Sequence, residues 1–88
     1  MDLMLATSKA GHDNHQVYVV LKKDENYFYL VNGTTKPMYK PKKKKKIHLQ
    51  LIKNIPEKVL AEIQDKNSLD DILIKRILKV YNRRNEVV

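Results

Sequence analysis

Residues 16–33 read QVYVVLKKDENYFYLVNG, and this stretch decides the fold class of the chain. Two segments rich in β-branched and aromatic residues, 16–23 and 27–32, flank the polar turn Asp24–Asn26. That composition is typical of β-strands, and Asn32-Gly33 is a strong turn dipeptide. The stretch therefore predicts two antiparallel strands joined by a tight turn.

Further strand signals lie on both sides of this pair. The short apolar run Leu3–Thr7 predicts a first strand, and residues 47–52 (IHLQLI) predict a final one. Between them, residues 36–46 contain Pro37 and Pro41, which remove backbone donors, so we expect a loop there and not a central strand. Four or five short strands with tight turns predict a small closed β-barrel.

After residue 53 the spacing of apolar residues changes to that of helices. Pro56 suits the first position of a short helix, and Ser68-Leu69-Asp70-Asp71 predicts a capping box that starts a second one. The apolar stripe expected of that second helix is Leu69, Ile72, Leu73, Ile77, Val80 and Tyr81. The chain is therefore expected to be mainly β, with a barrel over residues 1–53 and a helical C-terminal extension over 54–88 that packs on or beside it.

Positive charge is concentrated in the first half of the chain. Residues 1–53 hold eleven lysines and four acidic residues, whereas residues 54–88 hold seven basic and six acidic residues, for a net charge of +8. Five consecutive lysines, Lys42–Lys46, follow Lys36 and Lys40, and no acidic residue occurs from position 26 to 56. Five adjacent ammonium groups repel one another, so we expect a solvated cationic ridge that faces a polyanion.

Length and composition exclude several classes of protein. A chain of 88 residues without cysteine indicates one small domain with no disulfides. No run approaches the roughly 18–20 apolar residues of a membrane span, and the N-terminus lacks the pattern of a signal peptide. We therefore expect a cytoplasmic protein, most simply a monomer, that does not associate with membranes.

The sequence contains no motif that predicts a catalytic site or a metal site. The chain has no cysteine nucleophile and no glycine-rich phosphate loop, and helix capping accounts for the acidic pair Asp70-Asp71. His12, Asp13 and His15 form an H-D-x-H pattern, but no fourth ligand lies near it in the sequence. The expectation is a protein that is not an enzyme and that carries no metal or other cofactor.

Three segments resemble parts of KOW-domain RNA-binding proteins. The turn Ser8–Asp13, followed by the strand 17–20, resembles a KOW motif, which occurs in ribosomal and transcription-elongation proteins. Residues 29–33 (YLVNG) resemble the V-D-G turn of archaeal and eukaryotic large-subunit ribosomal proteins with one SH3-like barrel. The run 40–49 is similar to the following segment of short bacterial proteins with a single KOW domain. The similarity covers most of residues 3–52, and the helical tail matches in layout only.

The resemblance implies an SH3-like barrel that binds structured RNA, usually ribosomal RNA of the large subunit. It assigns Ser8, Lys9, Gly11, His12 and Asp13 to the motif loop. Tyr39, which lies among lysines, is the best candidate for stacking on an unpaired base. Together, charge and resemblance give these candidate RNA-binding residues: Lys9, Gly11, His12, Lys36, Tyr39, Lys40, Lys42, Lys43, Lys44, Lys45 and Lys46.

Each of these interpretations has an alternative. The lysine run can be a solvated loop that keeps the protein soluble, and Tyr18 and Phe28 are expected to pack the barrel. Arg76, Arg83 and Arg84 in the second helix either contact RNA or protein or remain in water. For the whole chain the alternative is a protein-interaction module in transcription or translation, for example on RNA polymerase, with a groove built on Tyr27 and Tyr29. Binding to such a groove depends little on salt, whereas binding to RNA depends on it steeply.

Overall fold

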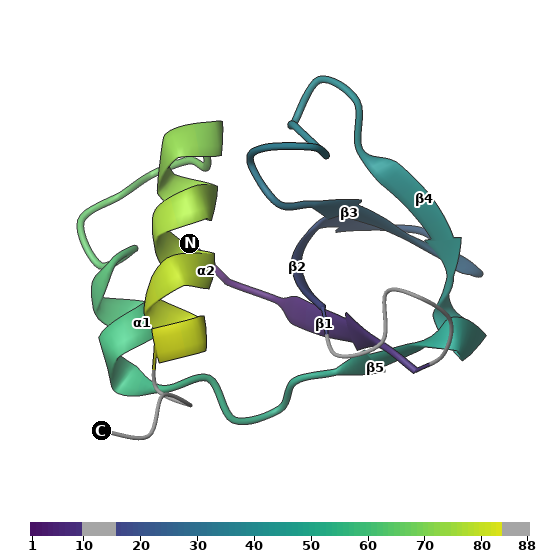
Figure 1. The fold of residues 1–88 in the computed structure, drawn as a ribbon, viewed down its shortest axis with the longest axis horizontal. Helices are drawn as coiled ribbons and strands as arrows, with labels where there is room; N and C mark the ends of the chain where they lie inside the picture. Colours follow the sequence, from purple (N-terminus) through teal and green to yellow (C-terminus); the bar gives the residue numbers. More distant parts are fainter. Residues whose placement is uncertain (10–15, 84–88) are drawn as a thin grey trace.

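The computed structural model describes residues 1–9 and 16–83, and strands precede helices in it as the sequence predicts (Figure 1). The expected order, a mainly β part followed by two helices, is confirmed. In chain order the elements are β1 (Leu5–Ser8), β2 (Val17–Lys23), β3 (Tyr27–Val31), β4 (Lys42–Lys45), the 3-10 helix Lys46–His48, β5 (Leu49–Leu51), α1 (Glu57–Ala61) and α2 (Asp71–Arg83).

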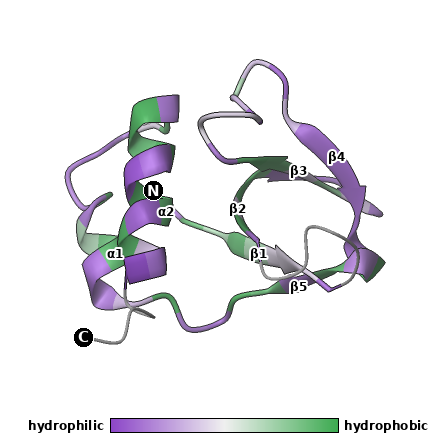
Figure 2. Ribbon diagram, in the orientation of Figure 1, coloured by the Kyte–Doolittle hydropathy of each residue, from purple (hydrophilic) through white to green (hydrophobic). Residues whose placement is uncertain are grey.

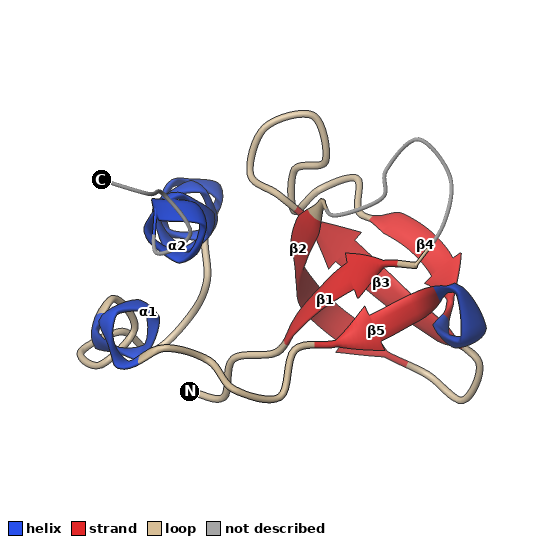
Figure 3. Ribbon diagram, turned by 60° about the horizontal axis from the view of Figure 1, so that its bottom comes forward, coloured by secondary structure: helices blue, strands red, loops and turns tan. Residues whose placement is uncertain are grey.

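The strands form one antiparallel sheet in the order β4-β3-β2-β1-β5. In the β2–β3 pair Val19 lies opposite Val31, and a bulge interrupts the register between Val20 and Lys22. A bulge increases the local twist of a sheet, and the sheet curls round on itself (Figure 3). The 3-10 helix leads from β4 directly to β5, the two edge strands. Within residues 1–9 and 16–83 no strand pairing joins these two edges, so the predicted closed barrel is not shown.

Both faces of the sheet bury apolar side chains, because successive side chains of a strand point to opposite faces. The face inside the curl is filled by Ala6, Tyr18, Val20, Phe28, Leu30 and Leu49. On the opposite face the strands and the helices share one cluster (Figure 2), whose buried members are Leu5, Val19, Val31, Val59, Ile63, Leu73, Ile74, Ile77, Leu78 and Tyr81. The prediction that Tyr18 and Phe28 are core residues is confirmed.

Helix α2 buries a stripe that differs from the predicted one. Leu73, Ile77 and Tyr81 are buried as expected, and Ile74 and Leu78 are buried beside them. Ile72 is 75% exposed, so its assignment to the stripe was wrong. In a helix with 3.6 residues per turn, Ile72 projects from the side opposite the centre of the buried stripe.

The start of α2 is also different from the prediction. The N–H group of Leu73 donates to Asp70 Oδ1 at 2.7 Å, so Asp70 caps the helix in place of Ser68. Asp71, the acidic residue of the predicted capping box, instead accepts a hydrogen bond from the N–H group of Met38 at 2.9 Å. The predicted box was therefore wrong, because its carboxylate is used to hold a distant loop.

The segment 36–46 was expected to be a loop and not a central strand, and the loop assignment was wrong only for part of it, since no helix or strand is assigned to residues 36–41. Lys42–Lys45 form the edge strand β4, which pairs with residues 27–30 of β3. Pro41 comes immediately before this strand, where its missing donor removes no bond from the interior of the sheet. The predicted final strand over 47–52 shortens to β5, because the 3-10 helix takes up residues 46–48. The first strand lies at Leu5–Ser8, slightly later than predicted.

Candidate nucleic-acid interface

Strand β4 distributes its lysines between the two faces of the sheet. Lys42 and Lys44 lie opposite Leu30 and Phe28, on the face inside the curl, and are half-buried. Lys43 and Lys45 lie opposite Tyr29 and Tyr27, on the other face, and are exposed. Because alternate residues of a strand are about 7 Å apart, this arrangement separates charges that are adjacent in the sequence.

The lysines on the inner face contact residues of the fold. Lys44 Nζ donates to Ser8 Oγ at 3.0 Å, and Ser8 is only 2% exposed. The amino group of Lys46 lies 5.2 Å from the centroid of the Phe28 ring. Their aliphatic stems therefore cover the inner apolar cluster while their charge stays at its rim.

The outer face of β3 and β4 combines tyrosines with lysines. The Lys43 amino group lies 4.3 Å from the centroid of the Tyr27 ring, and that of Lys22 lies 4.6 Å from the Tyr29 ring. Lys22 was not among the predicted residues. Only the strand register brings it next to Tyr29, so no local signal in the sequence indicates it. Figure 2 shows that β4 is hydrophilic along its length.

Asp24 is the acidic residue that borders this outer face. Its carboxylate accepts hydrogen bonds from the N–H groups of Tyr27 at 2.8 Å and Asn26 at 3.0 Å, and from the Tyr29 hydroxyl at 3.3 Å. The Tyr27 hydrogen bond is the main cause that holds the pKa of Asp24 below its usual value, with smaller contributions from Asn26, Tyr29 and the charge of Lys43. Partial desolvation acts in the opposite direction. Asp24 therefore stabilises the β2–β3 turn as a carboxylate.

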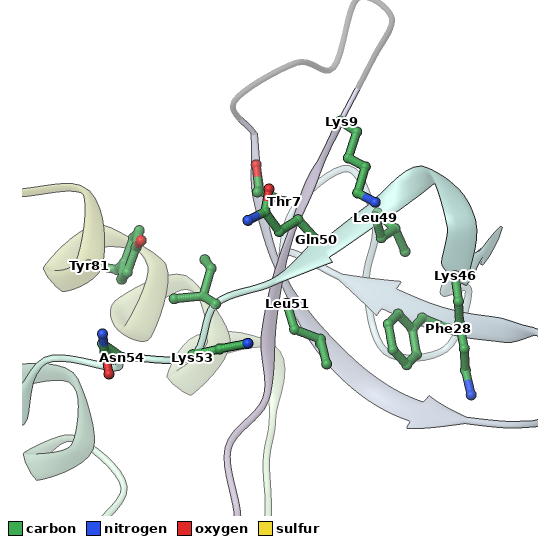
Figure 4. Close-up of a pocket in the computed structure, with 11 residues that line it drawn as sticks. Thr7, Lys9, Phe28, Lys46, Leu49, Gln50, Leu51, Lys53, Asn54 and Tyr81 are labelled. Carbon is green, nitrogen blue, oxygen red and sulfur yellow. The ribbon is translucent and has the colours of Figure 1, made fainter.

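Lys9 lies close to the C-terminal end of β4, beside the 3-10 helix that follows this strand. Its N–H group donates to the His48 carbonyl at 3.0 Å, which places the end of β1 next to the 3-10 helix. A groove of about 1050 Å³ runs along β5 (Figure 4), and Lys9, Lys46 and Lys53 line it. Among residues 1–9 and 16–83, no acidic side chain lines this groove. Lys53 was missed in the sequence, because it lies beyond the far end of β5 from Lys9, and only the folded sheet places both residues along one groove.

Three of the remaining predicted residues, Lys36, Tyr39 and Lys40, lie on the loop between β3 and β4, at the other end of β4 (Figure 1). The Lys36 amino group lies 5.6 Å from the centroid of the Tyr18 ring. Tyr39 is 86% exposed, and Lys40 beside it is exposed as well. Gly11 and His12 lie outside the described residues. The structure thus places four of the described candidate residues in β4 itself and the others in two groups, one at each end of that strand.

Comparisons with other proteins leave the family open, since no family model and no curated protein matches this chain.

Over residues 1–9 and 16–83, no three His, Asp or Glu side chains gather in a way that would hold a metal ion. The pattern of His12, Asp13 and His15 falls outside that part of the chain. Within the same described residues, no helix has the length and apolar character needed to cross a membrane. A function must therefore be inferred from the charge and geometry of the lysine-rich surface.

Proposed function

We propose that this protein binds structured RNA without catalysis, most simply ribosomal RNA of the large subunit. The observation that carries the proposal is that a whole edge strand, β4, consists of lysines on a folded sheet. No acidic residue occurs from position 26 to 56, and Asp24, whose carboxylate interacts with the charge of Lys43, is used mainly by the β2–β3 turn. Lysine ammonium groups bind phosphates as point charges, so they supply affinity and not base specificity.

The arrangement of these charges suits a long polyanion better than a small anion. Lys43 and Lys45 are exposed on one face of β4, and Lys40 precedes them on the loop. Lys46 follows the other end of the strand, and the groove that Lys9, Lys46 and Lys53 line continues from there along β5. We infer that successive phosphates of one RNA backbone lie along this path.

The resemblance to KOW-domain proteins points to the same class of ligand. The described strands are short and antiparallel, the sheet is curled, and a single 3-10 turn connects its two edge strands. These features support the SH3-like barrel that the resemblance implies. In this proposal Lys9, Gly11 and His12 of the motif loop position the RNA, and the lysines of β4 provide most of the affinity.

The experiment is a titration of a ribosomal RNA fragment at several salt concentrations. If about five to seven phosphates are neutralised, log Kd changes with log salt with a slope of roughly 4 to 6 in magnitude. The variant Lys43→Gln/Lys45→Gln should bind at least about tenfold more weakly at low salt, with a slope lower by about two. The control Lys58→Gln/Lys66→Gln changes two exposed lysines outside the proposed surface. Equal affinity and equal slopes for both variants would refute the proposed surface.

The alternative, a groove for peptides built on Tyr27 and Tyr29, meets a specific obstacle. Amino groups of Lys43 and Lys22 lie over these two rings, so a peptide would have to displace them. Binding of a peptide to aromatic side chains would also change little with salt. The same titration therefore distinguishes the two functions.

A further inference from the structure

Tyr39 is the one tyrosine of the described residues whose ring is left almost wholly in solvent. It is 86% exposed, whereas Tyr18 and Tyr81 are buried. Tyr27 and Tyr29 are half-buried, and each lies under a lysine amino group. An aromatic ring gains free energy from burial or stacking, so this ring is available to stack on a ligand.

The loop that carries Tyr39 is held in place by its own hydrogen bonds. The Asn32 side chain accepts from the N–H groups of Thr34 at 3.0 Å and Lys36 at 2.9 Å, and it donates to the Thr35 hydroxyl at 3.0 Å. The Asn32 N–H group donates to the Lys36 carbonyl at 2.9 Å. The first half of the loop is therefore a closed turn.

Tyr39 itself lies in a second turn, which runs from Pro37 to Lys40. The Lys40 N–H group donates to the Pro37 carbonyl at 3.0 Å, which is the hydrogen bond of a β-turn. Met38, the neighbour of Tyr39 in this turn, packs against the apolar cluster shared by the strands and the helices. With Met38 directed inward, Tyr39 projects outward next to the exposed Lys40.

Helix α2 fixes this second turn from outside the sheet. The Met38 N–H group donates to Asp71 Oδ1 at 2.9 Å, across 33 residues of sequence. Gly33 lies so close to α2 that an added Cβ would stand 2.5 Å from the Asp71 carbonyl oxygen. The loop is therefore hydrogen-bonded to the first turn of α2 at Met38 and lies closely against it at Gly33, which lowers the entropy lost when a ligand contacts Tyr39.

We propose that an unpaired base of the bound RNA stacks on Tyr39, and that Asp71 is a positioning residue for this contact. The inference rests on the proposed function and narrows its ligand to RNA with an unpaired nucleotide beside a stem. Bases in a duplex hide their faces, whereas bases in loops and bulges offer them to aromatic side chains. Lys40 is exposed next to Tyr39, and strand β4 begins two residues later, so lysines close to the ring in the chain can meet the phosphates that flank the base.

The test compares two RNAs with the same stem, one fully paired and one with a single bulged 2-aminopurine. For the bulged RNA, Tyr39→Ala should lose about 5- to 150-fold in affinity, and Tyr39→Phe should bind as the unchanged protein does, because it keeps the ring. The slope of log Kd against log salt should stay the same in both variants, because the side chain is uncharged. The fluorescence of 2-aminopurine should be quenched by the unchanged protein and not by Tyr39→Ala.

Asp71 is tested by a pair of substitutions. Asp71→Ala removes the acceptor of the Met38 hydrogen bond, so it should weaken binding of the bulged RNA about threefold or more and leave the paired RNA unaffected. Asp71→Asn keeps an acceptor oxygen and should restore binding. A merely structural role would change the affinity for both RNAs equally.

The outcomes separate this inference from the proposed function. If Tyr39→Ala binds both RNAs as tightly as the unchanged protein, stacking is overturned and RNA binding stands. If Tyr39→Ala weakens both RNAs equally, the preference for an unpaired base is overturned. If the unchanged protein binds neither RNA with a steep salt dependence, both proposals fail.

Discussion

At the scale of single residues, two aspartates determine where chain elements turn and begin. Asp24 accepts hydrogen bonds from the N–H groups of Asn26 and Tyr27, which shapes the turn between β2 and β3. Asp70 accepts from the N–H group of Leu73, which caps α2. In both places a short carboxylate satisfies backbone donors that have no partner in the regular element, as is usual for turns and helix starts.

The identity of the helix cap can be tested with a matched pair of variants. Asp70→Ala removes the acceptor of the Leu73 N–H group and should lower the free energy of unfolding by about 1 kcal/mol. Ser68→Ala removes the residue expected from the sequence to be the cap and should change it by less than about 0.5 kcal/mol. Urea denaturation measures both. A larger loss for Ser68→Ala would place the cap where the sequence predicted it.

Asp24 should make the stability of the protein depend on acid pH. The native pKa of Asp24 lies below its usual value, so at acid pH the unfolded chain binds more protons at this residue than the native chain. Its contribution to stability is fully present above the unfolded pKa of about 3.9 and is lost as the pH falls through the native pKa. The difference in denaturation midpoint between the unchanged protein and Asp24→Asn should therefore narrow between pH 6 and pH 3. A constant difference would contradict the assignment.

At the scale of elements, identical residues of β4 differ in environment and therefore in role. Its four lysines alternate between half-buried and exposed positions. Lys44 reaches the buried Ser8, whereas Lys45 lies on the exposed outer face. The same side chain therefore supports the fold at one position and is available to a ligand at the next.

Single alanine substitutions should reveal this division of tasks. Lys44→Ala removes the bond to Ser8 Oγ and the packing of the lysine stem, and should cost about 1 kcal/mol of unfolding free energy. Lys45→Ala should cost less than about 0.5 kcal/mol and should weaken RNA binding instead. Chemical denaturation and RNA titration of the two variants give the comparison. Equal losses of stability in the two variants would contradict the inference that Lys44 supports the fold and Lys45 does not.

At the scale of the whole molecule, α2 connects the outer apolar cluster with the loop that displays Tyr39. Its buried side packs with Leu5, Val19 and Val31 of the sheet. Its first turn accepts the hydrogen bond from Met38. The helix is thus part of the core and also holds a loop of the proposed interface.

Two isoleucines of α2 provide the test of this packing. Ile74 is fully buried and Ile72 is 75% exposed, although they are two residues apart. Ile74→Ala should lower the free energy of unfolding by about 2–5 kcal/mol, because it leaves a cavity, whereas Ile72→Ala should lower it by less than about 0.5 kcal/mol. Thermal or urea denaturation measures both variants. Similar values for the two would show that α2 does not dock through Ile74.

Local chemistry was enough to predict the strands β2 and β3, the Asp24–Asn26 turn and the presence of two helices after the sheet. Each of these depends on residues close together in the sequence, such as the β-branched run 17–20 or the apolar spacing of α2. The basic surface was also predictable, because five consecutive lysines without nearby acidic residues give a concentrated positive charge in any conformation of that segment.

Other features depend on contacts between residues far apart in the chain. Pairing with β3 made Lys42–Lys45 a strand in spite of the neighbouring prolines. Pairing of β1 with β5 built the groove that Lys9 and Lys53 line at its two ends. Packing of α2 against the sheet buried Ile74 and left Ile72 exposed. Local propensities of about 1 kcal/mol or less per residue cannot settle such choices. Burial of a large apolar side chain contributes roughly 1.5–3 kcal/mol, and the partners that make that burial possible exist only after the chain has folded.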